Sequence, residues 1–215
     1  MIERDYIMRM IQMLVQALVQ ILFHKRGGQY PEALGEIQKA SKTLIGVELD
    51  VIQRLSDIQI IELLSLVKIF GIPKCYVAGR LLKEEADILK LQGKNAEVPD
   101  LLVKSLSLMT EAAVQYGGPT DADHATAVDN IIRALPVDEL PVHVQKKLFK
   151  YYEIIHRYGK AEDVMFLIVD RESGFVTDGE RFYERLQKKS DEELIDGNFS
   201  RGEIKEGIAE LARRR

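Results

Sequence analysis

Gly28-Gln29-Tyr30-Pro31-Glu32-Ala33-Leu34 is the stretch of sequence that decides the fold. It separates a long apolar helical pattern from a second helical pattern. Gly28 suits the chain reversal after a helix, and Pro31 suits the first turn of the next helix, where its missing N–H costs nothing. Tyr30 can close the gap between two antiparallel helices, and Ala33 is small where they touch. The stretch therefore predicts a pair of antiparallel helices.

The pattern before this turn predicts a helix over Ile2–Arg26 with a wide apolar face. At about 100° per residue, the polar residues share one narrow stripe and the apolar residues cover an arc of roughly 220°. One core-facing side needs only about 100°. We therefore expect two sides to be covered, by the chain itself, which is the favoured alternative, or by a second copy. The polar stripe consists of Arg9, Gln12, Gln16, Gln20 and His24.

One set of apolar residues on this helix is the candidate interface with a second copy or another partner. It comprises Ile7, Met10, Leu14, Leu18 and Ile21. A membrane span is not expected, because a span needs about 20 predominantly apolar residues and this run contains Arg9 and three glutamines. An interfacial helix would carry more Lys and Arg on its polar face.

Glycine, proline and capping patterns divide the rest of the chain into further helices. The capping box Ser56-Asp57-Ile58-Gln59 opens one that continues to residue 70. Residues 164–170 form an apolar run that fits a buried strand or a helix, and the acidic turn after Gly159 favours the helix. The other predicted helices span about 31–45, 74–92, 98–116, 122–135 and 142–158, with a short segment near 49–51.

The C-terminal quarter is more polar and contains three capping patterns, each ahead of a short amphipathic segment. These are Thr177-x-x-Glu180, Ser190-x-x-Glu193 and Ser200-x-x-Glu203. We therefore expect one helical domain over residues 1–172 and an appendage of short helices over residues 173–215.

Three glycines predicted to lie between paired helices recur at a regular interval. Gly28, Gly93 and Gly159 are 65 and 66 residues apart, close to twice the 34-residue tetratricopeptide unit. The intermediate units do not show the tetratricopeptide signature. The spacing therefore indicates at most a degenerate repeat.

Three motifs carry a resemblance to a known family. They are Gly28-x-Tyr30-x-x-Ala33-Leu34, Val47-Glu48-Leu49-Asp50 leading to Leu55-Ser56-Asp57, and Leu81-Leu82-Lys83-Glu84-Glu85-Ala86-Asp87-Ile88. On these motifs the first 170 residues or so resemble uncharacterised tetratricopeptide-like (TPR-like) proteins of Firmicutes, a domain of unknown function. The resemblance implies stacked antiparallel helix pairs, as in a degenerate α-solenoid, and implies no activity.

Composition excludes several classes of function. A net charge of −4 gives no basic excess, so nucleic-acid binding is not expected. Cys75 is the single cysteine, which rules out an internal disulfide and fits a reducing compartment. The opening Met1-Ile2-Glu3-Arg4-Asp5 has mixed charges and no signal-peptide pattern, so we expect a cytoplasmic protein.

Candidate chemistry is confined to two short motifs. Glu153-x-x-His156 has the spacing found in di-iron bundles, but such a site needs a second copy of the motif, and a surface pair is favoured. Asp121-Ala122-Asp123-His124 offers three potential ligands, yet its acidic residues suit a helix N-terminus better. The sequence lacks a Walker pattern and a Gly-x-Ser-x-Gly elbow. We predict no catalytic, cofactor or metal site.

Four rings gather around the predicted helix 142–158, and we expect them to pack between helices rather than to contact a partner. They are Phe149, Tyr151, Tyr152 and Tyr158. The sequence thus predicts an all-α protein of about nine to eleven helices that acts as a non-catalytic scaffold for an unknown protein or peptide, with a homodimer as one alternative. The rival hypothesis is a helical small-molecule or metal-binding enzyme with a site near Glu153 and His156.

Overall fold

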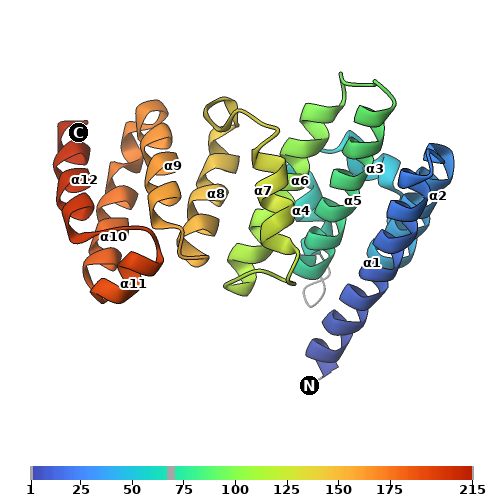
Figure 1. Cartoon of the computed structure of the whole chain (residues 1–215), viewed down its shortest axis with the longest axis horizontal. Coiled ribbons are helices and arrows are strands. Elements are labelled where there is room, and N and C mark those ends of the chain that lie inside the picture. Colours follow the sequence, from blue (N-terminus) through green and yellow to red (C-terminus); the bar gives the residue numbers. More distant parts are fainter. Residues whose placement is uncertain (1, 67–70, 215) are drawn as a thin grey trace. The chain divides into compact units, whose positions relative to one another are not determined.

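A computed structural model describes residues 2–66 and 71–214, with side chains from Asp5 onward. In this part of the chain twelve α-helices are joined by short connections, and no residue lies in a β-strand (Figure 1). The all-α prediction is therefore confirmed, and the number of helices is one above the predicted range.

The contacts divide the chain into two compact units, Met1–Leu135 (unit 1) and Pro136–Arg215 (unit 2). The predicted domain boundary after residue 172 lies inside unit 2 and stays a prediction. Unit 1 contains α1 (Ile2–Arg26), α2 (Tyr30–Ala40), the π-helix η1 (Ser41–Ile45), α3 (Leu49–Arg54), α4 (Asp57–Ser65), α5 (Gly71–Leu91), α6 (Val98–Tyr116) and α7 (His124–Ile132). Unit 2 contains the 3₁₀ turns η2 (Val137–Glu139) and η3 (Ser173–Phe175), with α8 (Val142–Ile154), α9 (Tyr158–Arg171), α10 (Val176–Gln187), α11 (Asp191–Asp196) and α12 (Arg201–Arg213).

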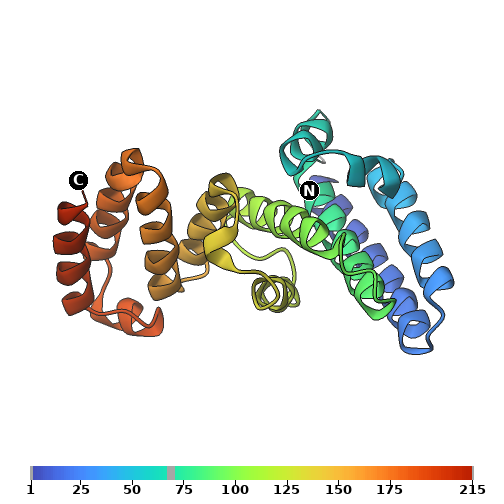
Figure 2. The ribbon, with the colours of Figure 1, turned by 90° about the horizontal axis from the view of Figure 1, so that it is seen from above.

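The turn after α1 has the predicted form. Gly28 is left-handed with φ of 71°, and α2 begins two residues later with Pro31 in its first turn. Ala33 is fully buried where α1 and α2 pack together, as its small size predicts. Gly93 is also left-handed, with φ of 75°, between α5 and α6. The antiparallel pairs α1–α2 and α5–α6 follow from these two turns (Figure 2).

The third predicted turn glycine is not in a turn, so the interval of 65 residues does not mark a structural repeat. Gly159 is the second residue of α9, and the chain reverses at His156, a non-glycine residue with φ of 56°. Asn, Asp and His tolerate this left-handed region better than most residues, which is why the glycine pattern misplaced the turn. The apolar run 164–170 lies within α9 and is helical, as favoured.

Two of the four predicted capping boxes are complete. Ser56 and Ser190 each accept a hydrogen bond from the backbone N–H three residues later, and Gln59 and Glu193 return the bond. At α12 the Ser200 hydroxyl accepts from the Glu203 N–H. The prediction of a cap at Thr177 was wrong. The turn η3 leads directly into α10, which begins at Val176, so Thr177 lies inside the helix.

Other boundaries move by a few residues. The helix opened by Ser56 ends at Ser65 in the described structure, and the predicted residues 67–70 lie outside the described part of the chain. α5 begins at Gly71, three residues before the predicted start, because Pro73 lies within its first turn, where no N–H is needed. α8 ends at Ile154 rather than at residue 158.

α5 is the central helix of unit 1. Fifteen of its 21 residues are buried, and it packs against α1, α2, η1, α4 and α6. Figures 1 and 2 show it between the α1–α2 pair and α6. The solvent-facing strip of this helix is narrow and holds Lys83, Asp87 and Lys90, so each charge buried elsewhere on the helix needs a polar partner.

The buried charges of α5 are each paired. Glu84 accepts a hydrogen bond from Lys25 of α1 at 2.5 Å, and the same ammonium lies 3.0 Å from Asp87. Burial disfavours the charged form of Lys25, but attraction to Glu84 and Asp87 outweighs this and raises its pKa. Glu85 accepts a hydrogen bond from the Gln53 side chain of α3, and burial raises the pKa of this carboxyl group.

Unit 2 has an aromatic core that joins α8, α9 and α10. Phe149 packs edge-on against Phe182 and Phe175, with ring centroids 5.3 and 5.6 Å away. Tyr151 and Tyr158 are fully buried, and Phe149 and Tyr152 are 3% exposed. The prediction that these rings pack between helices is confirmed.

Gly79 lies where α5 and α6 approach closely, and its substitution tests this approach. A Cβ atom at this position would lie 2.7 Å from Met109 Cγ and 3.0 Å from the Ser105 carbonyl oxygen. We expect Gly79→Ala to lower the free energy of unfolding by about 1–3 kcal/mol, because overpacking moves the two helices apart. Urea unfolding followed by circular dichroism measures the change.

The matched control is Gly35→Ala on the exposed side of α2, where the added Cβ meets nothing within 4 Å. This variant should gain up to about 1 kcal/mol, since alanine favours the helix more than glycine does. Equal stability of the two variants would contradict the close helix approach.

Candidate functional site

The apolar arc of α1 divides into a face buried against unit 1 and a face that is exposed among the described residues of unit 1. Met10, Leu14, Leu18 and Ile21 are at most 7% exposed inside unit 1, and Ile7 is half-buried. These five candidate interface residues thus belong to the side that α2 and α5 cover. An interface on α1 would have to use other residues.

The other side of α1 carries exposed apolar side chains. We call Met8, Val15, Val19 and Phe23 the free apolar face; their exposed fractions are 51, 47, 56 and 68%. At 100° per residue they lie within an arc of about 80°. Among the described helices, only the segment Asp5–Arg26 is long and apolar enough to cross a membrane, by length and composition alone. Its opposite side packs against the rest of unit 1.

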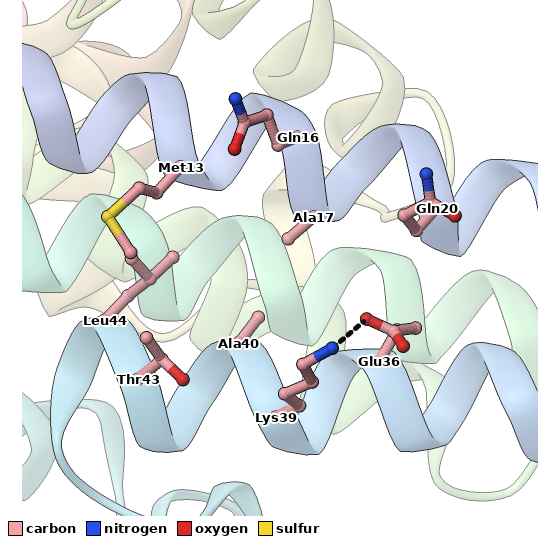
Figure 3. Close-up of a pocket in the computed structure, with 9 residues that line it drawn as sticks. All are labelled: Met13, Gln16, Ala17, Gln20, Glu36, Lys39, Ala40, Thr43 and Leu44. Atoms are coloured by element: carbon pink, nitrogen blue, oxygen red, sulfur yellow. Dashed lines mark ion pairs between the residues drawn. The ribbon is translucent and has the colours of Figure 1, made fainter.

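A shallow groove runs along α1 on a third side, between this helix and the α2–η1 segment (Figure 3). Ala17 and Ala40 point toward one another across its floor, and Leu44 and Met13 extend the apolar surface. Its volume of about 230 Å³ is below the roughly 300–1,000 Å³ of a small-molecule site. The groove is therefore large enough for an apolar side chain rather than for a whole substrate or cofactor.

Polar groups border this apolar floor. Gln16 and Gln20 lie on the α1 side, and neither side chain makes a hydrogen bond within the described part of the chain. On the opposite side Lys39 and Glu36 form an ion pair at 3.6 Å (Figure 3). A primary amide both donates and accepts, so two such groups can bind a peptide backbone.

The π-helix η1 forms one end of the groove. Its wider turn is closed by the bond from the Gly46 N–H to the Ser41 carbonyl, and Gly46 is left-handed with φ of 82°. Lys74 of α5 donates to the Ile45 carbonyl at 2.8 Å, which satisfies a carbonyl that the helix end leaves open. Single π turns occur often at functional sites, so the position of this one favours a functional role for the groove.

The predicted pair Glu153 and His156 does not form a joint site. The Glu153 carboxylate accepts two hydrogen bonds from the Arg185 guanidinium, at 2.5 and 2.8 Å. His156 lies in the left-handed turn beyond α8, with its exposed ring stacked against Tyr158 at 5.7 Å. The i, i+3 relation on one helix face, on which the enzyme hypothesis depends, is therefore lost.

The segment 121–124 is built into unit 1 rather than arranged around an ion. Asp121 accepts a hydrogen bond from Tyr76 at 2.6 Å, and the His124 ring stacks on Tyr76 with centroids 4.7 Å apart. The predicted capping role was wrong for Asp123, which occupies the N-cap position of α7 but makes no side-chain capping bond. Within residues 2–66 and 71–214, no group of three His, Cys, Asp or Glu could hold a metal ion.

The hydrogen bonds around His124 define its neutral form. The Thr120 N–H donates to Nδ1 at 3.0 Å, so Nε2 carries the proton that is donated to the Met109 carbonyl at 3.1 Å. Burial is the main reason that the pKa of His124 falls to about 4; Arg80 adds to the effect, and Asp121 and the Met109 carbonyl oppose it.

Unit 2 has a cavity of about 420 Å³ between α9 and α12. Four glutamates line it, which are Glu162, Glu203, Glu206 and Glu210. Tyr183 donates to Glu162 at 2.6 Å, and the Arg213 and Arg214 guanidinium groups bind Glu210. Two of the four carboxylates are thus already engaged within the fold.

The described part of the chain is thus all helical, and its first helix carries an exposed apolar face and a shallow groove. Comparison with family models then places it: the chain belongs to DUF6483, a family of unknown function whose model matches residues 1–215. Comparisons with curated proteins and with solved structures give no match.

The two surfaces on α1 were only partly visible in the sequence. The width of the apolar arc indicated that two sides would be covered, but the arc alone does not show which residues meet α5. The groove depends on two small residues, Ala17 and Ala40, that face one another from different helices, and no local motif marks that pair.

The neutral state of His124 predicts a pH dependence of stability. Its ordinary pKa near 6.5 falls to about 4 in the folded protein, so between these values the unfolded chain binds more protons. The contribution is present in full above pH 6.5 and is lost as the pH falls toward 4. A shift of this size is worth about 3 kcal/mol.

Unfolding by urea at a series of pH values from 7 to 4 measures this slope. His124→Gln is the matched control, because its amide does not titrate in this range while the other acidic groups remain. We expect the unfolding free energy of the native chain to fall more steeply than that of the variant. Parallel curves would show that the folded protein accepts the proton without loss.

Proposed function

We propose that the protein is a non-catalytic interaction module of the TPR-like kind. The groove between α1 and α2 carries this proposal, since it combines an apolar floor with polar groups on both sides. Consecutive antiparallel pairs, α1–α2 and α5–α6 in unit 1 and α8–α9 in unit 2, support the TPR-like interpretation. The single cysteine supports a cytoplasmic location.

The proposed ligand is a short segment of another protein that carries one large apolar side chain. Ala17 and Ala40 leave room for this anchor, and Leu44 and Met13 provide its apolar contacts. The amides of Gln16 and Gln20 can donate to backbone carbonyls of the segment and accept from its N–H groups. Backbone pairing of this kind gives affinity, and the anchor gives specificity.

The rival enzyme hypothesis has less support. Glu153 is held by Arg185, and His156 lies beyond the helix in a left-handed turn. A general acid or base must reach its substrate, and the Glu153 carboxylate is already occupied by the Arg185 guanidinium. The interaction module remains the function that the geometry favours.

Selection of phage-displayed random peptides on the full chain tests the proposal. Synthetic copies of the selected peptides are then measured by fluorescence anisotropy against the native protein and Ala17→Phe. The phenyl group would fill the groove, so we expect the dissociation constant to rise at least about tenfold, equivalent to roughly 1.4 kcal/mol.

Ala125→Phe is the matched control, because Ala125 is half-buried like Ala17 but lies on α7, away from the groove. It should leave the affinity unchanged, and thermal unfolding shows that both variants fold. Selection that returns no peptide of millimolar affinity or better would contradict the proposal, as would equal binding by Ala17→Phe.

A further inference from the structure

The free apolar face of α1 is too extensive to be left to solvent without cost. Of the twelve large apolar side chains that are exposed in the described structure, four form this face, and a fifth on α1, Met13, lines the groove. Only 22% of the most apolar window of this helix is buried. Contiguous exposed apolar surface of this kind marks an interaction site in a soluble protein.

Charges at the two ends of the same face indicate what covers it. Asp5 near the start of α1 and Arg26 at its end are both exposed. At 100° per residue both lie within the arc of the free apolar face. Neither forms an ion pair with another described residue. The free apolar face, whose arc also contains the exposed Gln12, therefore runs from an acidic residue to a basic residue, an order of charges that is complementary to itself when reversed.

We propose that two copies of the chain pair through α1 in antiparallel orientation. With the contact centred between Val15 and Gln16, Met8 of one copy lies opposite Phe23 of the second copy, and Asp5 lies opposite Arg26. A methionine sulfur against an aromatic ring is a favourable contact. Val15 of both copies lies next to the two-fold axis, Val19 of each copy lies opposite Gln12 of the other, and the contact is closed and self-complementary.

The same charges disfavour a parallel pair. Parallel α1 helices would place Asp5 beside Asp5 and Arg26 beside Arg26, and their helix dipoles would align. Like charges at both ends repel, whereas the antiparallel pair has an attractive contact at each end. The charges thus determine the orientation, while the apolar side chains provide the driving force.

This dimer does not depend on peptide binding. The groove that holds the proposed ligand lies on the α2 side of α1 and is lined by Met13, Gln16, Ala17 and Gln20 on this helix. None of these belongs to the free apolar face; Gln16 borders that face, whereas Ala17 lies about 120° beyond its edge. Ala17→Phe should therefore leave the dimer intact, so that failure of one proposal is distinguishable from failure of the other.

Sedimentation velocity of the full chain across micromolar concentrations tests the proposal. We expect a dimer, and we expect the double variant Val15→Glu/Val19→Glu to raise the dissociation constant at least about a hundredfold. Ile58→Glu on α4 is the matched control, with a side chain of similar exposure in the same unit, and should remain dimeric. A native chain that stays monomeric at about 200 µM, a concentration at which even a weak dimer would form, would overturn the proposal.

A charge exchange tests the orientation and does not rely on apolar substitutions that could unfold the chain. Asp5→Arg or Arg26→Asp alone should weaken the dimer roughly tenfold, since each replaces two attractions with two repulsions. The double variant Asp5→Arg/Arg26→Asp should restore the native dissociation constant. No restoration, or a dimer that neither charge affects, would refute the antiparallel pairing.

Sedimentation with phosphatidylcholine vesicles, with and without phosphatidylglycerol, distinguishes a lipid surface as the occupant. We expect the native chain to remain in the supernatant as a dimer. The contrary result is a chain that is monomeric without vesicles, binds to them, and loses this binding in the variant Val15→Glu/Val19→Glu. That result would show that lipid, and not a second copy, covers the free apolar face.

Discussion

The enclosure of α5 is the constraint on which the rest of unit 1 depends. A helix that is covered over most of its surface gains much from apolar burial, but this gain has no direction and does not fix where the covering helices lie. The buried charges supply that direction. Glu84 requires Lys25 from α1, Glu85 requires Gln53 from α3, and Arg80 acts through Tyr76 on Asp121 before α7. Each neighbour is thus positioned by a buried polar group that would destabilise the folded state if it had no hydrogen-bond partner.

This arrangement explains why α1 has surfaces left over. α5 takes its core side, and α2 takes the adjacent side except where two alanines leave the groove open. The free apolar face has no neighbour among the described residues of unit 1, although its residues are as apolar as the buried ones. One helix therefore contributes to the core, to a candidate peptide groove and to a candidate contact between copies. A wide apolar arc on a single helix acquires a meaning only when the position of its neighbours is known.

Local chemistry accounts for what could be predicted. Left-handed glycines such as Gly28 and caps such as Ser190 act within a few residues of themselves, so the sequence pattern locates them. The turn at His156 was missed because a non-glycine residue adopts the left-handed conformation there. The π turn and the pairing of Lys25 with Glu84, 59 residues away, arise from packing between distant segments. The separation of core from free face on α1 could not be predicted for the same reason.

The ion pairs of Lys25 have a mechanical consequence. They fasten α1 to α5 close to the C-terminal end of the helix, whereas the last fully buried side chain toward its N-terminal end is Met10. Residues 5–9 lie beyond this point, with Tyr6 and Ile7 half-buried and the other three exposed, and they form the less enclosed arm of a rigid helix that is anchored in the core. A load applied to that arm, for instance by a bound partner, is transmitted through a rigid helix to a salt bridge buried against the central helix. A displacement of this arm would then strain the ion pair between Lys25 and Glu84 in the interior of unit 1.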